Sequence, residues 1–172
     1  GVWDCTDVEN INRLGPIVPL PSSGAESYVH SSWNTADNQT AYVATEIGNR
    51  QIYILDQSDI NNIELDTTWK EPLLECIGRT GNVPHNPYVH NDILYISYYQ
   101  DGVNMLELSD PRKPTRIGYY DLDPNNSVYN GTTSNWGVYP FFDSGTVIGS
   151  DTHTGLYVIK VNSILPVDLI DF

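Results

Sequence analysis

The chain has 172 residues, of which 40% are hydrophobic and 17% charged, and its formal net charge is −14. Such an acidic chain repels nucleic acid and anionic lipid surfaces, so we expect neither as a partner. No apolar run of the roughly 18 residues that a membrane span needs is present, and no signal peptide is visible, so we expect a mature or truncated product. Abundant Tyr, Val, Ile and Thr, punctuated by 13 Gly and 11 Pro, indicate an all-β chain with many turns.

Taken in chain order, the predicted elements form three series that recur at one period. In the first series an apolar strand leads into a polar turn, and its last positions are Asp7, Asp59, Asp110 and Ser163, spaced 52, 51 and 53 residues apart. The second series comprises His30-Ser31-Ser32-Trp33, His85-Asn86-Pro87-Tyr88 and Asn135-Trp136-Gly137-Val138-Tyr139. The third comprises residues 41–45, 94–98 and 146–150. A shared period in three series predicts a structural repeat of about 52 residues.

Each repeat is predicted to contain four strands. The first carries His or Asn followed by an aromatic residue, and a glycine-bearing turn follows the second strand at Gly48-Asn49, Asp101-Gly102 and Thr154-Gly155. The third strand of each repeat ends at the last position of the first series, as at Asp59 and Asp110. The fourth is expected near Leu73–Ile77 and again at Thr115–Tyr120.

Several strands are apolar on both faces, as in Ile52–Leu55. This pattern is expected when a sheet is sandwiched between neighbours, as in a β-propeller blade. We therefore predict an all-β chain with four-stranded antiparallel propeller blades. Residues 1–27 form the end of a preceding blade and a connection, 28–80 and 81–131 are whole blades, and 132–172 are a blade with an incomplete last strand or a C-terminal extension.

Three blades and part of another cannot close a ring, because closed propellers have about four to eight blades. The chain is then either a fragment of a larger propeller or a unit that assembles through its blade faces. Open faces of this kind would otherwise be prone to aggregation.

These segments resemble the LVIVD-repeat propellers of the choice-of-anchor B family. The likeness is carried by residues 85–88, 106–111, 136–140 and 155–158, and the segment around His30 also looks like that family. The resemblance implies a secreted or cell-surface protein and supplies no catalytic residues. The chain has fewer blades than that family.

Candidate site residues fall on the first strands and the turns. His30, His85 and Asn135 occupy matching places nearest the predicted central channel, where they could hold a metal or polar ligand. The more ordinary interpretation is that each bonds neighbouring backbone and locks adjacent blades. Asp151 and His153 are expected to share a strand face, and Glu46 lies near the matching place one repeat earlier. These residues could bind Ca²⁺ or a transition metal, although a solvated hairpin tip is the simpler interpretation.

Other recurring residues have simpler interpretations too. Asp7, Asp59 and Asp110 suit turn formation, with cation sites as the alternative. The aromatic residues could line a glycan or peptide surface, although recurring aromatics are more often core; they are Trp33, Tyr88, Trp136 and Tyr139.

Covalent modification is possible at several positions. Cys5 and Cys76 could form a disulfide, remain buried thiols or pair outside this chain. Asn38, Asn125 and Asn130 begin glycosylation sequons.

No hydrolase or nucleotide-binding motif is present. We therefore expect a non-catalytic extracellular or cell-surface module that binds a protein or carbohydrate partner or copies of itself. No cofactor is required by the sequence, and Ca²⁺ is a candidate. The alternative is a metal-assisted hydrolase with a site at the channel, built on His30 and His85.

Overall fold

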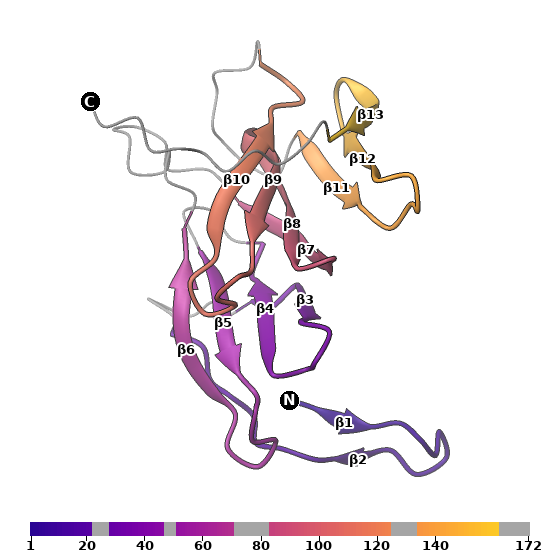
Figure 1. Ribbon diagram of the computed structural model, residues 1–172. Coiled ribbons are helices and arrows are strands. Elements are labelled where there is room, and N and C mark those ends of the chain that lie inside the picture. Colours follow the sequence, from indigo (N-terminus) through magenta and orange to yellow (C-terminus); the bar gives the residue numbers. More distant parts are fainter. Residues whose placement is uncertain (22–27, 47–50, 71–82, 125–133, 162–172) are drawn as a thin grey trace, which may run out of the picture.

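The computed structural model describes residues 1–21, 28–46, 51–70, 83–124 and 134–161 (Figure 1). Within these ranges the chain is all-β, with four antiparallel sheets and one turn of 3-10 helix. A two-stranded hairpin, β1 (Trp3–Asp4) and β2 (Asn12–Arg13), precedes three larger sheets. The described part of the chain contains no helix with the length and apolar character needed to cross a bilayer.

Three successive sheets follow the chain order, and each strand pairs with the next one along the sequence. The first sheet contains β3 (Ser31–Asn34), β4 (Thr40–Ala44), β5 (Ile52–Asp56) and β6 (Glu64–Trp69). The second contains β7 (Pro84–His90), β8 (Ile93–Tyr98), β9 (Gly102–Glu107) and β10 (Thr115–Tyr120), with the 3-10 turn η2 (Tyr99–Asp101) before β9. The third contains β11 (Asn135–Tyr139), β12 (Thr146–Asp151) and β13 (Gly155–Lys160).

The fourth strands test the predicted repeat. The strand expected at Thr115–Tyr120 is confirmed as β10. In the first sheet the fourth strand is β6, earlier than the predicted strand near Leu73–Ile77, which lies outside the described residues. The polar and half-exposed pattern of β6 explains the difference, because an edge strand needs few apolar side chains and gives a weak hydrophobic signal.

The recurring aspartates cap turns, as the local interpretation predicted. The Asp7 carboxylate accepts a hydrogen bond from the backbone N–H of Glu9, and Asp59 and Asp110 accept the same bond from the residue two places on. The predicted positive backbone angles are confirmed at Gly102 and Gly155, with φ of 68° and 100°. A side chain at Gly102 would collide with the Tyr120 carbonyl, so this turn requires glycine.

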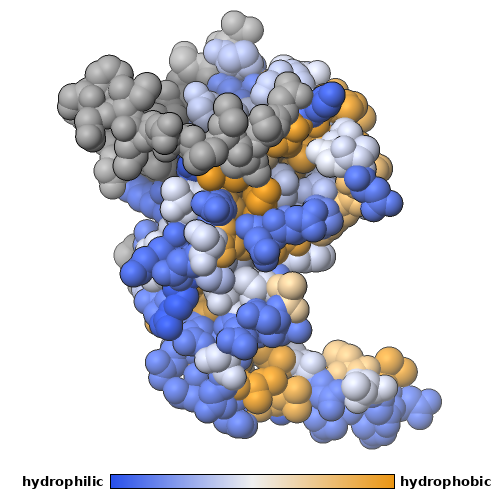
Figure 2. Space-filling model, viewed as in Figure 1, coloured by the Kyte–Doolittle hydropathy of each residue, from blue (hydrophilic) through white to orange (hydrophobic). Residues whose placement is uncertain are grey.

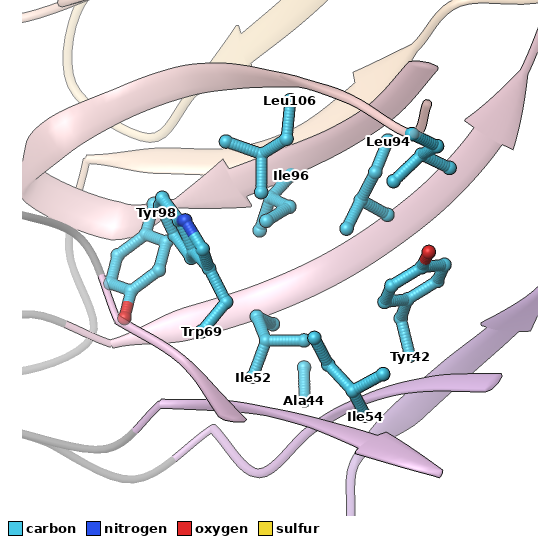
Figure 3. Packing of buried hydrophobic residues seen from close by; sticks show 10 residues of the cluster. Tyr42, Ala44, Ile52, Ile54, Trp69, Leu94, Ile96, Tyr98 and Leu106 are labelled. Atoms are coloured by element: carbon cyan, nitrogen blue, oxygen red, sulfur yellow. The ribbon is translucent and has the colours of Figure 1, made fainter. Parts of the chain in front are cut away.

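The hydrophobic core lies between the sheets rather than beneath one of them. Figure 3 shows side chains of the first and second sheets pointing toward one another. This cluster contains Tyr42, Ile52, Ile54 and Trp69 on one side and Leu94, Ile96, Tyr98 and Leu106 on the other. A second cluster joins the second and third sheets through Tyr95, Val103, Val138 and Val147. The second sheet therefore buries apolar side chains on both faces, as the two-sided pattern predicted.

Polar contacts also link the first two sheets at their outer ends. The Tyr42 hydroxyl donates a hydrogen bond of 2.9 Å to the Pro111 carbonyl. Arg112, in the β9–β10 turn, donates to both carboxylate oxygens of Asp66 on β6. Because Arg112 is exposed, solvent screens this pair and we expect it to contribute little to stability.

The outer face of the third sheet is apolar and exposed. Leu156 and Val158 on β13 are 67% and 72% exposed. Figure 2 shows hydrophobic residues at the surface over β11–β13, whereas hydrophilic residues dominate the surface over the turns.

A pair of leucines on corresponding strands tests where the stability resides. Leu106→Ala on β9 removes a fully buried side chain from the cluster between the first two sheets, so it should lower the free energy of unfolding by about 2–5 kcal/mol. Leu156→Ala on β13 is the matched control and should change it by about 0.5 kcal/mol or less. Urea unfolding followed by circular dichroism measures both. Equal losses would contradict a core located between the sheets.

Candidate functional site

Two β-bulges set which side chains meet where the first strands of the sheets converge. On β7 and β11 the pairing register shifts by one residue, so His85 and Trp136 are bulge residues with no partner in the ladder. In the first sheet Ser31 pairs with Ala44, which places His30 just before the first pair. The residue equivalent to His30 and His85 in the third sheet is therefore Trp136. The prediction that Asn135 continues this series is wrong, because equivalent bulges on β7 and β11 match Asn135 with Pro84 and Trp136 with His85.

His30, Glu46 and His85 form a compact cluster at this convergence. His30 Nδ1 lies 3.1 Å from Glu46 Oε2, and His85 Nε2 lies 3.5 Å from Glu46 Oε1. One ligand atom from each residue can be chosen so that all three lie within 4.8 Å of one another. The two imidazole rings stack with centroids 4.4 Å apart and an angle of 17° between their planes. The first and second sheets both contribute to the cluster.

Local backbone structure holds Glu46 in place. It is the second residue after β4 and has a φ of 51°, a left-handed conformation that is uncommon outside glycine. Its backbone N–H donates to the Pro84 carbonyl at 3.1 Å, which ties this residue to the second sheet. The buried Tyr99 hydroxyl donates to Glu46 Oε1 at 2.8 Å. Burial and this carboxylate both raise the pKa of Tyr99, so the hydroxyl remains a donor.

His85 is the most constrained member of the cluster. Its side chain is 2% exposed, and Nδ1 is hydrogen-bonded to the backbone carbonyl of Trp136 in the third sheet. A carbonyl oxygen can only accept, so Nδ1 carries the hydrogen. The Asn86 amide nitrogen, 2.8 Å from Nδ1, is a donor too and donates to the same Trp136 carbonyl at 3.3 Å. Nε2 then has a lone pair directed toward Glu46 and makes no hydrogen bond. Burial lowers the pKa of His85, which favours this neutral form.

Two neutral imidazoles and a carboxylate are a donor set typical of transition-metal sites. Among the described residues, no other group of three or more metal-ligating side chains comes together in this way. His85 also links the second and third sheets through the Trp136 carbonyl, so the predicted locking role and the predicted ligand role fall on the same residue.

The other predicted polar residues lie outside this cluster. Asp151 accepts hydrogen bonds from the Ser134 hydroxyl and from the backbone N–H groups of His153 and Thr154, so it organises the β12–β13 hairpin. Burial would raise the pKa of Asp151, but these hydrogen bonds outweigh it and the pKa is lowered. His153 is exposed at the hairpin, with Nδ1 4.0 Å from Asp123. Asn135 is buried opposite Asp151, and its amide finds no hydrogen-bond partner among the described residues.

A second feature lies at the other end of the first strands. We use "aromatic band" for Trp33, Tyr88, Tyr139, Phe141 and Phe142. Trp33 and Tyr88 meet edge to face at 5.0 Å, and Phe141 contacts both rings and Tyr139 at 5.4–5.8 Å. Trp33, Tyr139 and Phe142 are 39–48% exposed, so the prediction that the recurring aromatics are core is wrong for Trp33 and Tyr139, and also for Trp136 at 49%.

A groove of about 790 Å³ runs beside Trp33, between the β3–β4 and β7–β8 turns. Polar side chains line it, among them Asn34, Asn38, His90, Asn91 and Asp92. This volume falls within the range of small-molecule sites, about 300–1,000 Å³. One side of the groove is thus an aromatic ring, and the other offers amide and carboxylate groups.

Only some of the predicted modification sites fall in the described ranges. Asn38 is exposed in the β3–β4 turn, with a φ of 58°. Asn125 and Asn130 lie outside the described residues, as does Cys76. Cys5 is exposed and has no disulfide partner within the described ranges, so its pairing with Cys76 stays a prediction.

The sequence analysis named Glu46 only as the counterpart of Asp151 and His153, did not place it with His30 and His85, and did not identify Tyr99. Glu46 and Tyr99 lie one or two residues after the second strand of their sheet, 53 residues apart, so the repeat period itself was a usable signal. Their different chemistry hid it, because one is an acid and the other a phenol.

Comparison with known proteins gives a likeness of fold. The chain matches no model of a protein family and no curated protein sequence. It is similar to the extracellular domain of a protein from B. thetaiotaomicron described as a hybrid two-component system, with a TM-score of 0.50 and 15% identity. The match covers 89% of this chain and 18% of that one, so the chain spans less than a fifth of that structure. At this identity the likeness concerns the fold alone.

His85 predicts a specific pH dependence of stability. Because burial makes its pKa lower in the folded chain than the ordinary histidine value of 6.5, unfolding takes up a proton below that pH. The stability that comes from neutral His85 should be complete above pH 6.5 and decline as the pH falls toward the folded-state pKa. Urea unfolding at about pH 7.5 and about pH 5.5 should show a steeper loss for the wild type than for His85→Gln. Parallel losses would contradict the assignment.

Proposed function

We propose that the chain is a section of an extracellular β-propeller that acts as a non-catalytic binding module. Three antiparallel sheets in chain order, packed face to face through two apolar clusters, support the blade interpretation. The similar solved structure is an extracellular domain, which supports a location outside the cell. We also retain the resemblance to the LVIVD-repeat propellers of the choice-of-anchor B family as a proposal.

The groove beside the aromatic band is the main observation that supports a binding function. Exposed aromatic side chains are costly unless they serve recognition, and here they gather from three sheets at one end of the first strands. Trp33 comes from the first repeat, Tyr88 from the second and the other three rings from the third, so the surface exists only when the sheets are stacked. The fold thereby produces a binding surface that no single repeat contains.

Carbohydrate is the ligand class that this groove suits best. A sugar has an apolar C–H face that can lie on an aromatic ring such as Trp33, and hydroxyls that can bond amides and carboxylates such as Asn34 and Asp92. The acidic chain disfavours polyanionic ligands, so a neutral glycan is expected. A protein partner that presents apolar and hydroxyl groups would use the same surface.

The apolar outer face of β13 suits packing against another sheet. Leu156 and Val158 would be covered if a further blade lay on this face. That blade belongs either to a longer polypeptide or to another copy of this chain, so self-assembly remains part of the proposal.

One observation favours a second function, a metal-assisted hydrolase. The cluster of His30, Glu46 and His85 supplies two imidazoles and a carboxylate, a ligand set that leaves a coordination position for water in catalytic zinc sites. His30 is the accessible member, with 27% of its side chain exposed. A substrate would approach from that side.

Two exposed tryptophans give a matched test of the binding role. On an array of neutral glycans, the wild-type chain should bind a ligand whose affinity falls by about tenfold or more in Trp33→Ala, since aromatic contacts at the centre of a site often contribute over 1 kcal/mol. Trp3→Ala removes an exposed tryptophan on β1 that does not line the groove, and should leave the affinity unchanged. Equal losses in both variants, or no glycan bound by the wild type, would contradict carbohydrate recognition.

The hydrolase alternative is tested separately. It predicts that the metal-loaded chain cleaves members of a panel of activated esters and phosphoesters, and that His30→Gln abolishes the cleavage while Trp33→Ala does not. No turnover by the metal-loaded wild type leaves the binding module as the better account.

A further inference from the structure

We propose that His30, Glu46 and His85 form a binding site for one divalent transition-metal ion of the zinc class, which joins the first and second sheets. The site is distinct from the groove, so it does not depend on carbohydrate binding. It requires nothing beyond residues that are already in contact.

His85 is prepared for coordination before any metal arrives. Metal-bound histidines usually donate their second ring nitrogen to a carbonyl or carboxylate, which fixes the tautomer and the ring. Here Nδ1 donates to the Trp136 carbonyl, and the free nitrogen is Nε2. That nitrogen is buried without a hydrogen bond, an arrangement that is costly unless something else uses its lone pair.

Glu46 has the matching support of a metal-bound carboxylate. Tyr99 donates to Oε1 and orients the group, as outer-shell partners do in known metal sites. Zinc bonds of about 2.0–2.2 Å place tetrahedral ligand atoms about 3.3–3.5 Å apart. The spacings from His30 to Glu46 Oε2 and from His85 to Glu46 Oε1, 3.1 and 3.5 Å, are close to this range. A set of one ligand atom from each residue spans up to 4.8 Å, so the ligands must draw together on binding.

His30 must make the one adjustment that binding needs. The two imidazole planes are nearly parallel, at 17°, so their nitrogen lone pairs do not yet converge on a single point. His30 precedes β3 and is the most exposed of the three ligands, so its ring can turn toward Glu46 without disturbing the core. Water can fill the fourth position on this exposed side.

The donor atoms select the kind of metal. Ca²⁺ takes six to eight oxygen ligands, whereas this site offers two nitrogens and one carboxylate. Imidazole favours zinc, copper and nickel. Ca²⁺, the candidate ion named from the sequence, therefore does not fit this cluster.

Coordination would couple the metal to the packing of the sheets. His30 and Glu46 belong to the first sheet, and His85 belongs to the second and is bonded to the third. Because the unfolded chain does not hold these ligands together, zinc should raise the Tm as well as bind.

Zinc titration of the purified 172-residue chain against a chromophoric chelator tests the site. We expect one equivalent bound, with affinity lowered at least tenfold in His30→Gln and in Glu46→Gln, because even outer-shell changes typically cost about 10- to 100-fold. Zinc should raise the Tm of the wild type and leave that of the two variants unchanged. A millimolar excess of Ca²⁺ should not displace the metal.

A matched variant and a fold check make the result decisive. His153→Gln removes an exposed histidine outside the cluster and should bind zinc like the wild type. Far-ultraviolet circular dichroism identifies any variant that fails to fold, and the exposed position of His30 makes His30→Gln the safest of them. The proposal is overturned if the wild type binds no zinc, if folded His30→Gln and Glu46→Gln both bind as the wild type does, or if Ca²⁺ competes on equal terms.

Discussion

The burial of both faces of the second sheet is the constraint on which the rest of the structure depends. Leu94 and Ile96 on β8 face the first sheet, whereas Tyr95 between them faces the third. A sheet with two apolar faces cannot be stable alone in water, because about 25 cal/mol is lost for each Å² of apolar surface left exposed. The three sheets therefore stabilise one another as a stack.

Stacking also determines where chemistry can occur. The first strands of the sheets converge, and their bulges at His85 and Trp136 place one extra side chain from each sheet at the junction. His85 reaches across to the third sheet through the Trp136 carbonyl, and Glu46 reaches the second through its backbone bond to Pro84. At the other end of the same strands the aromatic residues meet. Both candidate sites are thus products of packing between repeats.

Much of the fold could be predicted because its signals are local. Asp59 and Asp110 cap turns with their own neighbouring backbone, and Gly102 is required by a positive φ, so sequence spacing located these turns correctly. The site was harder to predict because its geometry is not local. Alignment by motif chose Asn135 as the third member of the histidine series, whereas the equivalent bulges on β7 and β11 match Trp136 with His85. Register shifts of this kind depend on pairing and leave no mark in composition.

The cluster also explains how one residue can serve both structure and binding. A neutral His85 bonded only to the Trp136 carbonyl would already fasten two sheets, yet this leaves its second nitrogen buried and unused. Replacing His85 by an apolar residue would avoid that cost, and an amide would preserve the carbonyl bond. Neither replacement could bind a cation beside Glu46. The combination of a fixed donor nitrogen, an oriented carboxylate and an exposed third ligand is therefore better accounted for by a metal than by packing alone.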